Sequence, residues 1–258
     1  MSGSGGSGDW RFVKFGLLVT GRGEMEFLPD FFRAVMQTGQ CSFQVIGRIQ
    51  QLAPVSSSQR KAEMVGKRGQ VFDKNEQMIG AVARRFIQED ADHFVLVIDD
   101  LEADHRNRAG EKFERYRRPL DALLGKNRWR AAVHFLRNML EAYYLAHAQA
   151  VNDVLGTNLA DYPEDVEDIQ HPKGELKSQA PNYREVEHGA KIVHRLELDH
   201  VLSRPETCAS LRSLVAWCYQ AQGLPTGNRF CMDVGAYFMI TGRQRVNPEA
   251  PRPSPSRQ

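Results

Sequence analysis

The chain has 258 residues, of which 41% are hydrophobic and 26% are charged. These proportions are typical of a soluble globular protein, and the length allows one large domain with a helical addition. The formal net charge is only +2, so any attraction to nucleic acid must come from local basic patches. The sequence contains neither an apolar run long enough for a membrane span nor the pattern of a signal peptide. We therefore expect a cytoplasmic protein that does not bind membranes.

The four cysteines are widely scattered and form no CxxC pair. This spacing argues against a zinc knuckle or a disulfide framework and favours reduced, mostly buried thiols. Composition predicts four parts: a flexible Gly/Ser segment (1–10), an α/β domain (11–160), a helical region packed on that domain (161–246) and a disordered proline-rich tail (247–258).

Residues 12–19 (FVKFGLLV) predict a first strand, and residues 25–36 carry apolar side chains at helical spacing. The intervening turn, TGRGE, contains two glycines and ends at Glu24. The glycines allow a tight turn, and Glu24 would lie in the first turn of the helix. This turn lacks the lysine and hydroxyl of a phosphate loop. Its simplest interpretation is a tight loop whose acid stabilises the helix dipole.

Residues 43–49 predict a second strand, residues 73–88 a helix and residues 94–98 a third strand. Alternating strands and helices favour an α/β fold, with a mainly parallel sheet flanked by helices. The third strand ends in a cluster of acids: Asp99, Asp100, Glu102 and Asp104. Asp100, Glu102 and Asp104 alternate, so they share one side of an extended segment and could converge on a hard cation such as Mg²⁺. The alternative is a solvated acidic turn.

A basic segment follows the acids at residues 105–118 (HRNRAGEKFERYRR). Cations interleaved with aromatic residues beside an acidic cluster suggest phosphate binding next to a metal site. A charged, exposed helix face is the alternative. The candidate phosphate contacts are Arg106, Arg108, Lys112, Arg115, Arg117 and Arg118.

The second half of the chain begins with a short predicted strand, residues 130–136, which leads into a helix at residues 138–155. Glu141 lies in an early turn of that helix, where it either lines a site or stabilises the helix dipole. Two further helices are expected at residues 182–196 and 205–222. Lys191, on the first of them, is a candidate phosphate contact or a surface residue.

Three motifs in this order (GLLVTGRGEMEFLPDFF, FVLVIDDLEADH and VHFLRNMLEAYYLAHA) resemble TOPRIM-like proteins related to the overcoming-lysogenization-defect (OLD) nucleases. The similarity is closest to small stand-alone members from prokaryotic defence loci. In that family the first turn carries two acids, but here Thr20 occupies the first acidic position and only Glu24 matches. Asp100 and Glu102 match the DxD-like motif, and Glu141 matches the helix motif.

The resemblance implies that the sheet is TOPRIM/Rossmann-like and that the protein is an effector nuclease of a prokaryotic anti-phage defence system. This nuclease would use Mg²⁺ or Mn²⁺, with Glu24, Asp100, Glu102 and Glu141 as the catalytic acids. The metal ligands would come from Glu24, Asp99, Asp100, Glu102 and Asp104. It also implies a nucleic acid substrate, with DNA favoured over RNA, and a separately encoded ABC-type ATPase partner; a homo-oligomer is left open.

Two other functions remain to be compared with the nuclease. A catalytically degenerate TOPRIM-like adaptor would tolerate Thr20. A calcium loop of the EF-hand type would use Asp100, Glu102, Asp104 and Glu111. The loop is disfavoured because His105 stands where a glycine is needed and a strand precedes the acids.

Overall fold

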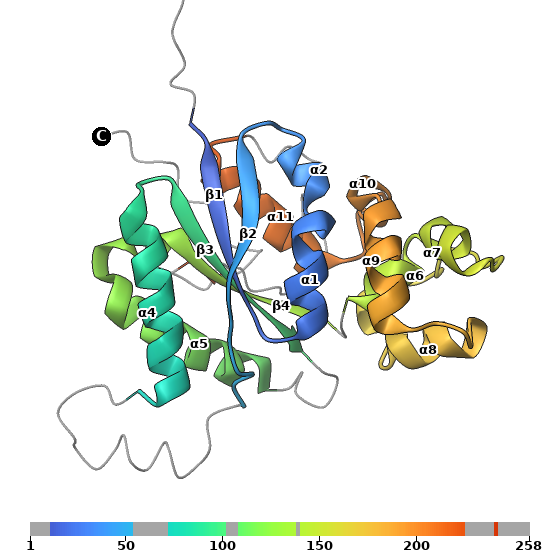
Figure 1. Ribbon diagram of the computed structural model, residues 1–258, viewed down its shortest axis with the longest axis horizontal. Helices are drawn as coiled ribbons and strands as arrows, with labels where there is room; N and C mark the ends of the chain where they lie inside the picture. Colours follow the sequence, from blue (N-terminus) through green and yellow to red (C-terminus); the bar gives the residue numbers. More distant parts are fainter. Residues whose placement is uncertain (1–10, 54–71, 102–107, 138–139, 225–239, 242–258) are drawn as a thin grey trace, which may run out of the picture.

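The computed structural model describes residues 11–53, 72–101, 108–137, 140–224 and 240–241 (Figure 1). Its strands form one sheet in the order β2-β1-β3-β4-β5. The first four strands of the chain are parallel, and β5 pairs antiparallel with β4. The prediction of an α/β fold with a mainly parallel sheet is confirmed. The strands are β1 (Val13–Val19), β2 (Cys41–Arg48), β3 (His93–Leu101), β4 (Ala131–Arg137) and β5 (Ile240–Thr241).

The central strands β1 and β3 are apolar on both faces because helices cover both sides of the sheet. Their register places Leu17 beside Leu96 and Val19 beside Ile98. All strands that run parallel to β3 end at the same edge of the sheet. The acids at the end of β3 therefore lie at the edge where α/β sheets bind their ligands.

One face of the sheet is covered by α4 (Lys74–Glu89) and α5 (Ala109–Leu124). The first begins with a capping box between Asp73 and Glu76. The two helices approach closely at Gly80, where an added Cβ would lie 2.4 Å from Cδ1 of Leu123. This face holds a compact core that includes Leu18, Val95, Val97, Phe86 and Tyr116.

The opposite face is covered by α1 (Arg22–Phe31), α2 (Arg33–Met36) and α11 (Ala209–Ala221). Buried Glu167 fixes the start of α11, since its carboxylate accepts the backbone N–H groups of Ser210 and Leu211 and the hydroxyl of Tyr143. The core on this face continues without a break from β1 to α11.

The remaining helices lie to one side of the sheet, where α1 packs against α9 (Figure 1). The single helix predicted at residues 138–155 is instead two helices, α6 and α7, which break around His147 and end at Gly156 in a left-handed conformation. None of the described helices is long and apolar enough to cross a membrane. These helices are α6 (Glu141–Leu145), α7 (Ala148–Leu155), α8 (Pro172–Gln179), α9 (Glu185–Arg195) and α10 (Leu198–Val201).

Candidate functional site

The two consecutive acids at the end of β3 have different environments because neighbouring residues of a strand face opposite sides of the sheet. Asp99 faces α5 and is fully buried. Asp100 faces α1, on the same side as Ile98 and the larger core. The strand thus gives one acid to each layer, and the two acids have different chemistry.

The Asp99 carboxylate is saturated by protein groups. Its Oδ2 lies 2.6 Å from Nζ of Lys112 and accepts the Tyr116 hydroxyl at 2.8 Å. Its Oδ1 accepts the Thr20 hydroxyl at 2.8 Å and the Gln51 amide at 3.1 Å. The interpretation of Asp99 as a metal ligand is therefore corrected: its oxygens are already occupied, and its charge is balanced by Lys112.

The Asp100 carboxyl group instead faces the Glu24 carboxyl group. Oδ1 of Asp100 and Oε2 of Glu24 are both buried, and neither has a hydrogen-bond partner among the residues that the structure describes. Burial raises the pKa of Asp100 well above its usual range, and the nearby Glu24 charge raises it further. Two carboxylate oxygens held together without a donor are costly unless a proton or a cation lies between them.

Gly21 allows Glu24 to take this position. It precedes α1 with an extended backbone, and the Glu24 side chain folds back over it. A Cβ at position 21 would lie 1.7 Å from Oε2 of Glu24. The glycine of the turn is thus needed for the space it leaves to the acid, and not for a positive φ.

Glu141, at the start of α6, is the third acid of this region. It is 4% exposed and contributes to the raised pKa of Asp100. Burial likewise raises the pKa of Glu141. Its Oε1 accepts the Tyr183 hydroxyl at 3.3 Å. The structure therefore brings together three of the predicted catalytic acids, Glu24, Asp100 and Glu141, from three separate elements.

An ion pair between Lys173 of α8 and Glu185 of α9 borders the three acids. Glu185 raises the pKa of Glu141 and Lys173 lowers it, so both charges are close enough to act on that carboxyl group. Lys173, Glu185 and Tyr183 were missed by the sequence analysis. Only the tertiary packing of α8 and α9 brings them to residues 24 and 141, and no local pattern predicts it.

The acid pair fits a hard divalent cation in its donor chemistry, because buried carboxylate oxygens without donors are ligands that Mg²⁺ and Mn²⁺ accept. Within the described ranges, however, no group of three acids, histidines or cysteines has the arrangement of a metal site. Glu102 and Asp104, two of the predicted ligands, lie outside the described residues, as does Arg106. The EF-hand alternative is contradicted because Asp100 belongs to β3.

Two predicted phosphate contacts on α5 are internal. Lys112 is 1% exposed; it pairs with Asp99 and donates to the backbone carbonyl of Asp100 at 2.7 Å. Arg117 is 2% exposed and donates to Asp121 and to the carbonyls of Arg128 and Ala131. Neither side chain is available to a ligand, so these two interpretations are corrected.

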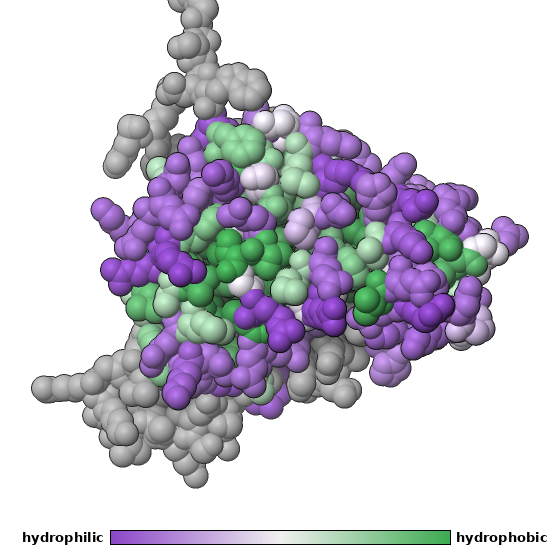
Figure 2. Space-filling view, in the orientation of Figure 1, coloured by the Kyte–Doolittle hydropathy of each residue, from purple (hydrophilic) through white to green (hydrophobic). Residues whose placement is uncertain are grey.

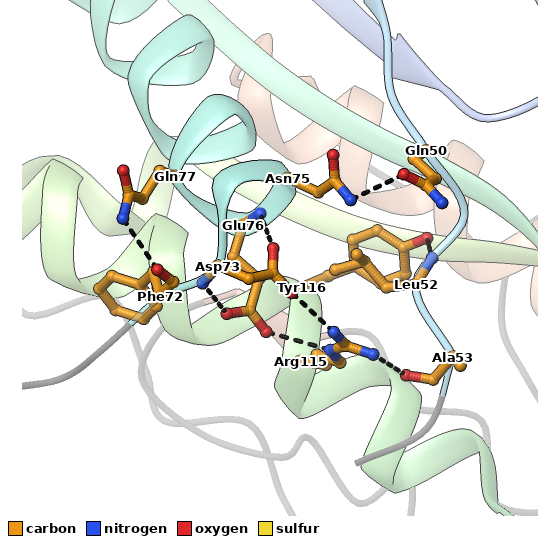
Figure 3. A network of polar contacts seen from close by, with 10 residues as sticks. All are labelled: Gln50, Leu52, Ala53, Phe72, Asp73, Asn75, Glu76, Gln77, Arg115 and Tyr116. Carbon is orange, nitrogen blue, oxygen red and sulfur yellow. Dashed lines mark hydrogen bonds and ion pairs between the residues drawn. The ribbon is translucent and has the colours of Figure 1, made fainter. Parts of the chain in front are cut away.

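The other predicted cations vary in how far they are available. Arg115 joins the cap of α4 to α5, with Asp73 at 2.8 Å and Glu76 at 3.0 Å (Figure 3). The guanidinium of Arg118 lies over the Phe72 ring, and Arg108 pairs with Glu111. Lys191 is exposed on α9. Most of the basic side chains of α5 therefore make contacts within the α4–α5 layer and do not form an exposed basic surface.

Residues 19–217 match the family described as a domain of unknown function, DUF4276. No curated protein matches the chain, and no solved structure does. The family match begins at the last residue of β1 and ends within α11, so it includes all three acids of the site. Because it spans well over half of the sequence, the chain belongs to the DUF4276 family.

Proposed function

We propose that this protein is a metal-dependent nuclease with a TOPRIM-like acidic site, related to the OLD nucleases in its motifs. One observation carries the proposal: the carboxyl groups of Glu24 and Asp100 lie close enough to interact, and each has a buried oxygen to which no described residue donates a hydrogen bond. A protein that gained nothing from this arrangement would lose stability by keeping it. A Mg²⁺ or Mn²⁺ ion would neutralise both charges.

The residues around the acid pair have separate roles in this proposal. Glu24 and Asp100 would hold the ion, which when bound would activate water and stabilise charge on a phosphodiester. Nζ of Lys112 donates a hydrogen bond to the backbone carbonyl oxygen of Asp100 and so holds the backbone of Asp100 in position. Burial raises the pKa of Glu141, which favours its protonated form more than at an exposed site and suits a group that exchanges a proton.

The test combines Mn²⁺ titration calorimetry with a plasmid-nicking assay on Glu24→Gln and Asp100→Asn. Each substitution keeps the side-chain shape and removes one of the two neighbouring carboxyl groups. We expect each variant to lose metal affinity by at least about tenfold and to lose nicking. Without metal, each should be as stable as the wild type or more stable, because the repulsion is gone. Asp30→Asn, which changes an exposed acid near the end of α1, is the matched control.

The outcome that would overturn the proposal is a folded wild-type protein that binds no Mn²⁺. Metal binding that survives both substitutions would equally exclude this acid pair as the site. Loss of stability together with loss of binding would mean that the acids are structural.

A degenerate TOPRIM-like adaptor is the second candidate, and the internal positions of Lys112 and Arg117 favour it. A nuclease needs cations for the phosphate backbone, and two of the predicted ones are unavailable. The adaptor would bind a separately encoded ABC-type ATPase in the cytoplasm. It predicts a complex with that ATPase that forms equally well with Asp100→Asn and shows no cleavage with either metal.

A further inference from the structure

We infer that Arg48 and Arg22 form a phosphate-binding rim beside the acid pair, taking the place of the cations buried in α5. The inference rests on the proposed function, because it supplies the substrate contacts that the acidic site needs. Its ligand class is the phosphodiester backbone of a nucleic acid, which arginine binds through paired N–H donors.

The sheet register places Arg48 on the same face as Asp100. Arg48 pairs with Val19, and Val19 pairs with Ile98, so these three residues form one row across β2, β1 and β3. Partners in a row share a face of the sheet, and Asp100 lies two residues beyond Ile98 on that face. Two strand spacings and two residues along β3 separate the Cα atoms of Arg48 and Asp100 by roughly 12 Å.

Arg22 lies in the first turn of α1, two residues before the buried Glu24, with its own side chain on the exposed face of the helix. Its side chain is 70% exposed and pairs only with Glu26 among the described residues, at 2.9 Å. An exposed i,i+4 ion pair contributes little to stability, so a phosphate can replace Glu26 at small cost.

Arg48 is exposed at the end of β2, and no hydrogen bond or ion pair joins its guanidinium to any described residue. This distinguishes it from Lys112, Arg115 and Arg117, which are all held by internal partners. On the face shown in Figure 2, strongly hydrophilic groups lie over the lower end of α1, beside an apolar patch.

The charges are thus arranged in two zones. Buried acids attract a cation, while exposed arginines from β2 and α1 attract an anion next to it. A phosphodiester that contacts a metal ion and continues along the protein surface carries the complementary charges. A ligand without repeated negative charge would use only one of the two zones.

The test is fluorescence anisotropy with a labelled oligonucleotide, as single strand and as duplex, in EDTA so that no cleavage occurs. The proteins are the wild type, Arg48→Ala, Arg22→Ala and the double variant. Arg85→Ala is the control, because Arg85 is an exposed arginine in the C-terminal half of α4, near the start of β3 at the opposite end of the strands. Each rim substitution should weaken binding about fivefold or more and lower the slope of log K against log salt by about 1. Arg85→Ala should stay within about twofold of the wild type.

A wild-type protein that binds neither oligonucleotide overturns the inference, and so does a double variant with unchanged affinity and salt slope. The anisotropy experiment does not depend on cleavage. If the rim variants lose binding but the wild type never cleaves with Mn²⁺, the rim stands and the nuclease proposal fails. If the wild type cleaves and the double variant binds normally, the nuclease proposal stands and the rim fails.

Discussion

Substitution of Lys112 by methionine tests whether this basic side chain of α5 is buried in an ion pair. Nζ of Lys112 lies 2.6 Å from Oδ2 of Asp99, and the two side chains are 1% and 0% exposed. Methionine preserves much of the volume but leaves the Asp99 charge buried without its counter-ion. Removing one partner of a buried ion pair typically costs about 3–5 kcal/mol. At about 2–4 °C per kcal/mol for a chain of this size, the melting temperature should fall by roughly 10 °C.

The assay is urea unfolding of the wild type, Lys112→Met, Asp99→Asn and the double variant. The double variant has no unpaired charge, so its loss of stability should be smaller than the sum of the two single losses by about 2 kcal/mol. Lys126→Met is the control, since Lys126 is exposed on the 3₁₀ helix Gly125–Arg130. If Lys112→Met changes stability by less than about 1 kcal/mol and shows no coupling, Lys112 is solvated and the original assignment to phosphate binding returns.

Three further predictions follow from single contacts. In Gly21→Ala the new Cβ displaces the Glu24 carboxyl group, and calorimetry should show Mn²⁺ affinity lowered by about tenfold or more with melting changed by only a few degrees. In Gly80→Ala the Cβ meets Leu123 and a backbone carbonyl, and urea unfolding should show a loss of about 1–3 kcal/mol. Burial raises the pKa of Glu167 from 4.5 to about 7, so the folded state binds its proton more tightly than the unfolded chain. That stabilisation is complete below pH 4.5 and is lost as the pH rises to about 7. Stability measured against pH should therefore fall over this window in the wild type by more than it does in Glu167→Gln.

Each of these has a clear contrary result. Unchanged Mn²⁺ binding in Gly21→Ala would show that Glu24 is not a ligand. Full stability in Gly80→Ala would show that α4 and α5 are farther apart than the contacts imply. Parallel pH profiles for the wild type and Glu167→Gln would mean that the buried carboxyl group titrates at its ordinary pKa.

The sheet could be predicted from sequence because its signals are local. The apolar run before Asp99 specifies a strand buried on both faces, and alternating helical segments specify parallel neighbours. The break between α6 and α7 was missed because the helical periodicity of residues 138–155 is continuous. Asp99 was wrongly grouped with Asp100 as a metal ligand, although strand alternation places the two on opposite faces, because the sequence does not show that Lys112 neutralises Asp99.

The basic segment was misinterpreted because its composition was considered without its periodicity. Lys112 lies one residue before Phe113 and four before Tyr116, on the inward face of α5, and Arg117 borders the same stripe. Helical spacing alone could have identified both as inward-facing. The Lys173–Glu185 pair is different, because it reaches the site only through packing of helices far along the chain. No local sequence pattern predicts that this pair lies at the site.

Thr20 provides the last test, because it occupies the position where the nucleases that the three motifs resemble carry their first acid. Its hydroxyl donates to Oδ1 of Asp99 at 2.8 Å. A carboxylate at position 20 would therefore face the Asp99 carboxylate, whose charge Lys112 already balances. We therefore expect Thr20→Glu to destabilise the protein by about 2–4 kcal/mol without raising Mn²⁺ affinity, because position 20 serves the Asp99 side of β3. Thr20→Val, which removes only the hydrogen bond, should cost about 1 kcal/mol. Urea unfolding and calorimetry measure the two effects separately. A stable Thr20→Glu protein with tighter Mn²⁺ binding would show that residue 20 faces the metal and that the loss of its acid had weakened the site. The expected result would instead mean that Thr20 and Lys112 form one internal arrangement, leaving Glu24 and Asp100 as the acids open to a cation.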